Sequence, residues 1–143
     1  MVIQMVISHP KLNQKFFFLS GLPRSGSTVL GAILSQNPSV FVTPTSPLLD
    51  LMTSTESAWA QIQATRSWND PQQLTNVYRG IFASIFSHIK RDVIVDKHRA
   101  WARNVAGLSH ILGYPPKILC TVRDISEILA SFFLLLRASR TYA

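Results

Sequence analysis

Residues 15–28 read KFFFLSGLPRSGST, and this stretch decides the fold class. A continuous apolar run at residues 15–20 stops at Gly21, which is typical of a strand buried on both faces of a parallel sheet. After a loop rich in glycine and serine, residues 27–36 have apolar positions at helical spacing, and Pro38 stops the pattern. The stretch therefore predicts a strand, a loop and a helix in direct succession.

The rest of the chain repeats this alternation. Further strands are predicted at residues 40–42, 93–96 and 117–122, and further helices at residues 70–89, 100–112 and 125–138, with a weaker helical pattern at 57–65. Asp70 and Pro71 suit the N-cap and the first position of the longest helix. Strands that alternate with helices predict an α/β domain with a parallel sheet flanked by helices.

Composition limits the class of protein. The chain has 143 residues, which is enough for one domain, expected at residues 15–143 behind an N-terminal extension at residues 1–14. With 47% hydrophobic and 15% charged residues it can bury a core, which excludes a disordered basic tail. Fourteen Lys and Arg against seven Asp and Glu give a net charge of +7, and this surplus indicates an anionic partner.

Several partner classes and locations are disfavoured. The basic positions lack interleaved aromatic residues, so we expect no nucleic-acid partner. No apolar run reaches the roughly 18 residues of a membrane span, and no secretory signal precedes the domain, so we expect a cytoplasmic protein. A single cysteine, Cys120, and four scattered histidines predict neither an internal disulfide nor a metal site.

The loop at residues 21–28 has the spacing of a phosphate-binding P-loop, with Ser27 where that motif has its lysine. Successive backbone amides and the positive end of the following helix would bind a phosphate, and Arg24 supplies a cation. One hypothesis is a P-loop nucleotide-binding protein or kinase that uses Mg-ATP, with Asp96 ending a strand of Walker B type. The missing lysine counts against it.

The motif PRSGST at residues 23–28 resembles the 5′-phosphosulfate-binding loop of the sulfotransferase superfamily, whose members use 3′-phosphoadenylyl sulfate (PAPS). Residues 122–133, VRDISEILASFF, resemble the superfamily's 3′-phosphate-binding segment. The resemblance implies a P-loop-NTPase-like fold, PAPS as the cosubstrate and no metal. It also implies that PAPS is bound by Pro23, Arg24, Ser25, Gly26, Ser27, Thr28, Arg123 and Ser131.

The same resemblance implies catalytic roles for Arg24, Lys97 and His98. Arg24 would neutralise charge on the leaving phosphate oxygen, Lys97 would steady the sulfuryl group, and His98 would take the acceptor's proton. Relatives of the tyrosylprotein and heparan type use a glutamate after the second strand instead. The nearest carboxylate there is Asp50, which ranks behind His98, and Glu56 lies further on.

The expected reaction is transfer of a sulfuryl group from PAPS to a hydroxyl or amine acceptor. The sequence does not decide whether that acceptor is a small molecule, a glycan or a peptide. The resemblance covers residues 15–135, and complete domains of this superfamily are roughly twice as long as the chain. The expectation is therefore a truncated domain that corresponds to the N-terminal portion.

Overall fold

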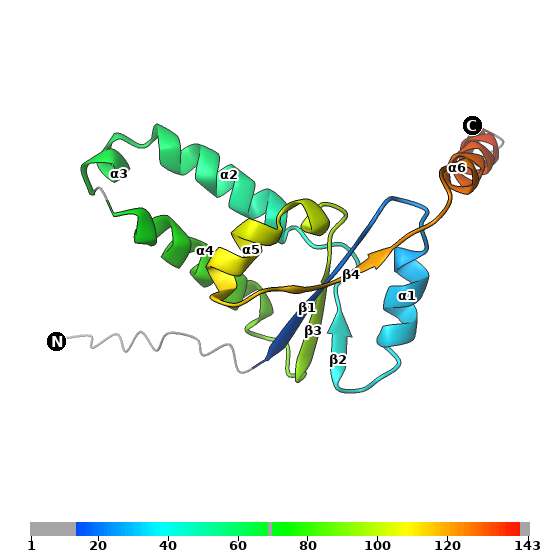
Figure 1. Ribbon diagram of the computed structural model, residues 1–143, viewed down its shortest axis with the longest axis horizontal. Helices are drawn as coiled ribbons and strands as arrows, with labels where there is room; N and C mark the ends of the chain where they lie inside the picture. The colour runs from blue at the N-terminus through cyan, green and yellow to red at the C-terminus, as the bar shows by residue number, and fades with distance from the viewer. Residues whose placement is uncertain (1–13, 69, 141–143) are drawn as a thin grey trace.

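The computed structural model describes residues 14–68 and 70–140, and its centre is a four-stranded parallel sheet (Figure 1). The strands are β1 (Lys15–Gly21), β2 (Val40–Val42), β3 (Val93–Lys97) and β4 (Lys117–Thr121), in the spatial order β2-β3-β1-β4. The predicted α/β fold with a parallel sheet is confirmed. Most of the predicted extension at residues 1–14 falls outside the described residues.

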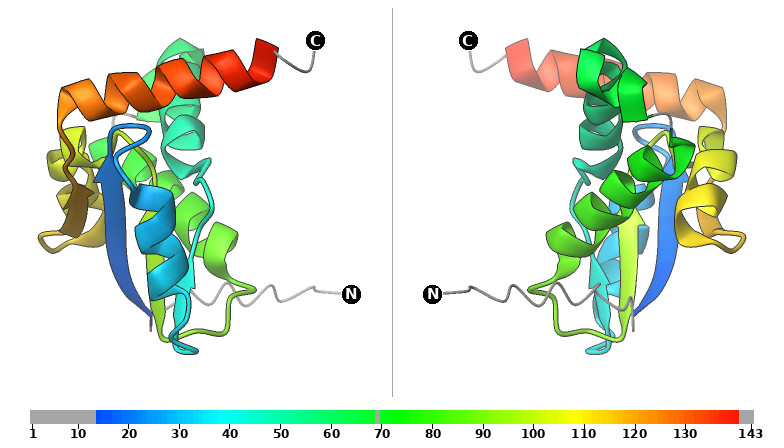
Figure 2. Two further views of the ribbon diagram at one scale, coloured as in Figure 1. Left: turned by 90° about the vertical axis from the view of Figure 1, so that its right-hand side faces the viewer. Right: turned by 90° about the vertical axis from the view of Figure 1, so that its left-hand side faces the viewer.

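Helices cover both faces of this sheet. They are α1 (Ser27–Leu34), α2 (Leu48–Gln61), α3 (Gln63–Trp68), α4 (Pro71–Phe86), the 3₁₀ helix η1 (Trp101–Arg103), α5 (Val105–Leu112) and α6 (Ile125–Arg140). Helix α1 lies on one face, and α2, α4 and α5 lie on the other (Figures 1 and 2). Because β1 lies between β3 and β4, the loop after β1 opens at the middle of the sheet's carboxyl edge.

The core lies between the sheet and the layer of α2, α4 and α5. Phe16 and Phe18 point into it from β1, because alternate residues of a strand face the same side. The rings of Phe16 and Phe82 are 4.5 Å apart, and those of Phe18 and Trp101 are 5.2 Å apart. On the opposite face Leu19 is fully buried near Gly31 of α1. These contacts fix β1, and with it the start of the loop.

Two helix predictions were wrong in their bounds. The weak pattern at residues 57–65 belongs to α2 and α3, and α2 begins at Leu48, where the amide donates to Ser46 Oγ over 3.1 Å. The helix predicted at residues 100–112 is divided into η1 and α5. The indole Nε1 of the fully buried Trp101 donates to Asp96 over 2.8 Å, and this bond holds the tight turn in place before α5 begins.

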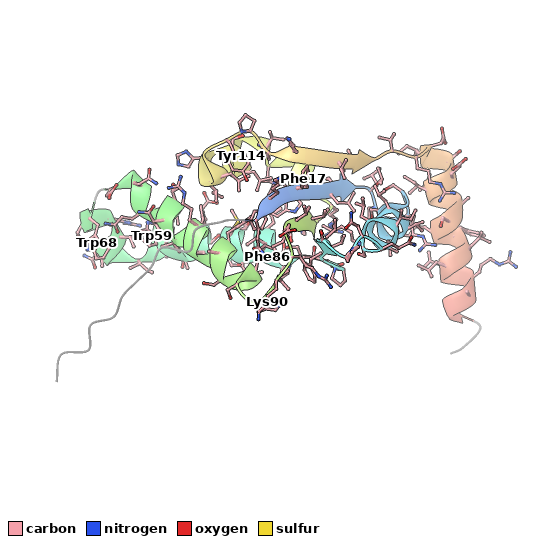
Figure 3. The ribbon with its side chains drawn as sticks, turned by 90° about the horizontal axis from the view of Figure 1, so that it is seen from below. Phe17, Trp59, Trp68, Phe86, Lys90 and Tyr114 are labelled. Carbon is pink, nitrogen blue, oxygen red and sulfur yellow. The ribbon has the colours of Figure 1, made fainter. Side chains whose placement is uncertain are left out.

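Helix α6 differs from the other helices in its packing. At helical spacing one apolar face holds Ile125, Ile128, Leu129, Phe132 and Leu136, which predicts packing against the core, but among residues 125–138 only Ile128 is buried. Ile125, Leu129 and Leu136 are 58%, 62% and 60% exposed, so this part of the prediction was wrong. Figure 3 shows α6 at one end of the molecule and α2 and α3 at the other. Among the described residues, no helix has the length and apolar character needed to cross a membrane.

Candidate functional site

The loop between β1 and α1 packs against the end of β4. Gly21 has a φ angle of 152°, and a Cβ atom built on it would lie 2.1 Å from Thr121 Oγ1. The hydroxyls of Ser25 and Thr121 are 2.6 Å apart and share a hydrogen bond. Only a glycine at position 21 therefore allows the loop and β4 to approach this closely.

Two more residues of the loop have positive φ angles, 69° at Arg24 and 97° at Gly26. Gly26 is the N-cap of α1, and no side chain caps this helix. The amide of Leu30 is the first to bond back within the helix, to the Gly26 carbonyl over 3.0 Å. The amides at positions 27–29 are therefore left for a ligand, at the positive end of the helix, where a phosphate is favoured.

An open pocket of about 210 Å³ lies between this loop and α6, and we call it the Ser131 pocket. Its lining residues are Arg24, Gly26, Ser27, Thr28, Val29, Arg123 and Ser131. Arg24 Nε donates to Ser131 Oγ over 2.8 Å, and Arg123 Nη1 donates to the Arg24 carbonyl over 3.1 Å. The fold thus brings together residues that lie about a hundred positions apart in the chain.

Arg123 also has a neighbour of opposite charge. Its Nε lies 2.7 Å from Glu127 Oε2, one turn further along the chain. Within residues 14–68 and 70–140 the other terminal nitrogen, Nη2, has no hydrogen-bond partner. Arg123 therefore keeps both N–H groups of Nη2 and one of Nη1 for an anion, although Glu127 compensates part of its charge.

A second open pocket, of about 420 Å³, lies on the other side of the loop, and we call it the Lys97 pocket. Its polar lining includes Arg24, Ser27, Thr28, Asp50, Lys97, His98 and Arg99, and Pro23 also lines it. Lys97 Nζ donates to Thr28 Oγ1 over 3.1 Å. The two pockets share Arg24, Ser27 and Thr28, so the phosphate loop forms a wall of both.

His98 lies beside Asp50 in the Lys97 pocket. Its Nε2 is 3.8 Å from Asp50 Oδ1, and its Nδ1 accepts a hydrogen bond from the Ala100 amide over 3.2 Å. An acceptor at Nδ1 carries no proton, so the proton of the neutral ring is on Nε2, on the side of Asp50. The His98 side chain is 11% exposed and that of Asp50 is 78% exposed. Of these two groups, the carboxylate is the one open to a molecule in the pocket.

Asp96, which the kinase hypothesis requires at a metal site, is in the core instead. It is fully buried, and its two carboxylate oxygens accept hydrogen bonds from Trp101 Nε1 and Thr43 Oγ1, over 2.8 and 3.3 Å. Burial raises the pKa of Asp96, and hydrogen bonds from Ser46, Trp101 and Thr43 oppose that shift. Asp96 lines neither pocket. In the part of the chain described, no group of three or more His, Cys, Asp or Glu residues is placed to hold a metal ion.

Sequence reasoning missed two residues of this region. Arg99 lines the Lys97 pocket, and its carbonyl accepts a hydrogen bond from Ser20 Oγ over 2.9 Å. Its position just after a strand at the carboxyl edge is the signal that could have found it. Thr121 contacts the loop through Ser25, and this contact depends on strand order, for which the sequence holds no local signal.

A protein-family model described as the Sulfotransferase family matches residues 17–143. This range is most of the chain and includes every predicted site residue. No curated protein matches the chain.

Proposed function

We propose that this chain, which belongs to the sulfotransferase family, transfers a sulfuryl group from PAPS to a hydroxyl or amine acceptor. The observation that carries the proposal is the pair of pockets that share the phosphate loop. The donor has a phosphate on its 3′ oxygen and a phosphosulfate on its 5′ oxygen. Two basic pockets on opposite sides of one loop suit such a molecule.

The residues at the two pockets fit the donor chemically. The amides at positions 27–29, with the hydroxyls of Ser27 and Thr28, would bind the 5′-phosphate, and the turn formed by Pro23, Ser25 and Gly26 would hold these donors in place. Arg123 and Ser131 would bind the 3′-phosphate. Because Arg24 lines both pockets, its cation is near each end of the bound nucleotide.

The proposed reaction is an in-line displacement at sulfur. The acceptor oxygen or nitrogen forms a bond to sulfur, the bond from sulfur to the 5′-phosphate oxygen breaks, and adenosine 3′,5′-bisphosphate leaves. Arg24 and Lys97 would stabilise the charge that grows on the leaving oxygen, and most of the rate enhancement would come from this charge stabilisation and from positioning. Lys97 suits this role because its ammonium group already contacts Thr28 at the loop.

For the acceptor's proton we propose that Asp50 is the general base and that His98 positions it. The sequence ranks these two residues in the opposite order. The support for the change is the hydrogen bond from the Ala100 amide, which occupies the lone pair of His98 Nδ1 and leaves the ring proton on Nε2. The exposed carboxylate of Asp50 is the free acceptor of the pair.

Isothermal titration calorimetry separates this proposal from the kinase hypothesis. The full chain is titrated with adenosine 3′,5′-bisphosphate and with ATP, each with and without Mg²⁺. We expect the bisphosphate to bind without Mg²⁺ and more tightly than ATP. ATP binding that depends on Mg²⁺, together with no heat from the bisphosphate, would refute the proposal.

A matched pair of variants makes the calorimetry specific. Arg123→Ala removes a cation from the Ser131 pocket, whereas Arg103→Ala removes an exposed cation on η1 that lines neither pocket. Bisphosphate affinity should fall in the first variant and stay unchanged in the second. Equal losses in both would mean that net charge alone attracts the nucleotide.

A further inference from the structure

A third open pocket lies within the helical layer, where α2, α4, η1 and α5 meet, and we call it the Trp101 pocket. Its volume is about 180 Å³, and its apolar walls are Leu49, Met52, Trp101, Leu108 and Ile111. Cavities of about 150 Å³ with apolar walls accommodate a single benzene ring. We propose that this pocket binds a small apolar amine.

Polar groups without protein partners lie at the rim of these apolar walls, where Glu56 is exposed and Tyr78 and Asn104 are half-buried. Glu56, Tyr78 and Asn104 line the pocket. Among the described residues, the Glu56 carboxylate, the Tyr78 hydroxyl and the Asn104 side-chain oxygen make no hydrogen bond, and Glu56 makes no ion pair. Two of these three groups only accept hydrogen bonds, so they favour a ligand that donates several.

The charged residues around the pocket indicate the sign of the charge on its ligand. Among residues 14–68 and 70–140 no lysine or arginine lines it, although the whole chain has fourteen, and Glu56 is its acidic residue. The other charge-capable side chain is His110, whose Nε2 is bonded to Thr75 Oγ1 over 2.9 Å. Desolvation, and secondly the charge of Glu56, raise the pKa of Tyr78, so its hydroxyl stays neutral. A negative group beside an open, mostly apolar pocket of one-ring size favours an ammonium group on an apolar body.

The Trp101 pocket is distinct from the proposed transfer site. It shares no lining residue with the Lys97 pocket or the Ser131 pocket, and its link to the transfer site is the contact between the rings of Trp101 and His98, whose centroids are 5.9 Å apart. Binding there requires no PAPS, so this inference does not depend on the proposed function.

The test is a calorimetric titration of the full chain with three probes that share a phenyl ring. These are 2-phenylethylamine, the neutral 2-phenylethanol and the anionic 3-phenylpropionate. We expect the amine to bind with a dissociation constant of about 0.1 to 1 mM. The alcohol should bind about fivefold more weakly, the carboxylate more weakly still, and Glu56→Gln should remove the preference for the amine.

A matched pair at Gly107 locates the binding. Gly107 lines the pocket from α5, and a Cβ atom built there meets nothing within 4 Å. Gly107→Leu should lower amine affinity about tenfold or more by filling the space, while Gly107→Ala should change it less than about twofold. Both replace a helical glycine by a better helix former, so both should fold. Equal binding of all three probes, unaltered binding to Gly107→Leu, or no binding at all would overturn the proposal.

Discussion

The two pockets beside the phosphate loop are supported in different ways. The Lys97 pocket lies at the end of β3. The preceding residue of that strand, Asp96, is buried and accepts hydrogen bonds from Thr43 and Trp101. The Ser131 pocket depends on α6, a helix whose apolar residues are mostly exposed. The comparison teaches that Lys97 and His98 are held at the end of a core strand, whereas the groups proposed for the 3′-phosphate are held by a few surface bonds.

The largest expected effect concerns the core-supported side. Asp50→Asn should lower kcat by about 10²- to 10⁴-fold, because it removes the proposed proton acceptor without changing the shape of the side chain. The assay measures labelled sulfuryl transfer from PAPS to a mixture of phenols, sugars and amines. His98→Asn is the comparison variant, and its loss should be about tenfold if it only positions Asp50. A larger loss in His98→Asn would return the base role to the histidine.

The next largest effect is on stability. Asp96→Ala leaves the Trp101 and Thr43 donors without acceptors in the core, and should lower the free energy of unfolding by about 3 kcal/mol. Urea denaturation followed by tryptophan fluorescence measures the change. An effect below about 0.5 kcal/mol would mean that the core does not support the Lys97 pocket.

Arg123→Ala tests the Ser131 pocket, which depends on α6. Loss of a charge-assisted pair of bonds should weaken adenosine 3′,5′-bisphosphate binding by about 10- to 100-fold. The urea midpoint should stay nearly unchanged, because this side chain is exposed and its ion pair with Glu127 is on the surface. A large fall in the midpoint would contradict the distinction between the two sides.

The pH dependence of stability tests the buried carboxyl of Asp96, and we expect a smaller effect there. Because burial raises the pKa of Asp96 above its usual 3.8, the native state binds this proton more strongly than the unfolded state does. The stability contributed by this group is therefore present below about pH 4 and is lost as the pH rises through the native pKa. Asp96→Asn lacks this titration, so its stability relative to the wild type should increase with pH over that interval. A difference that is constant with pH would refute this.

The smallest effect is expected at an exposed apolar residue of α6. Leu134 is 64% exposed, so Leu134→Ser should change the free energy of unfolding by less than about 0.5 kcal/mol. Ile128 is 5% exposed, and Ile128→Ala should cost about 2 kcal/mol or more. Thermal unfolding of the two variants measures both values. Similar losses would mean that the whole helix packs against the body.

Strands and the phosphate loop could be predicted because their signals are local. The apolar run that stops at Gly21 indicates a buried strand end, and it does so without knowledge of any partner strand. The start of α2 could not be predicted, because it depends on Ser46, and the Ser46 amide in turn donates to the carbonyl of the distant Lys97 over 2.8 Å. For the same reason the proximity of Asp50 to His98 has no sequence signal, since Asp50 lies in the first turn of α2 and His98 lies in the loop after β3.

The division of the predicted helix at residues 100–112 has a similar cause. Trp101 fits a helical pattern by its apolar character, but its indole bonds to Asp96 in the core, and that bond overrides helix propensity. In α6 the apolar spacing is also helical, and the helix forms as predicted. Periodicity indicates which residues share a face, but it does not indicate what covers that face.

The close approach at Gly21 has a consequence for which nucleotides the chain can accept. Arg123 follows Thr121 by two residues, so the distance from the loop to β4 also sets the distance from the loop amides to the Arg123 guanidinium. A side chain at position 21 would push β4 outward and lengthen that span. The absence of a side chain at Gly21 thus sets how far apart two phosphates on one nucleoside must be if one is to reach the loop amides and the other Arg123.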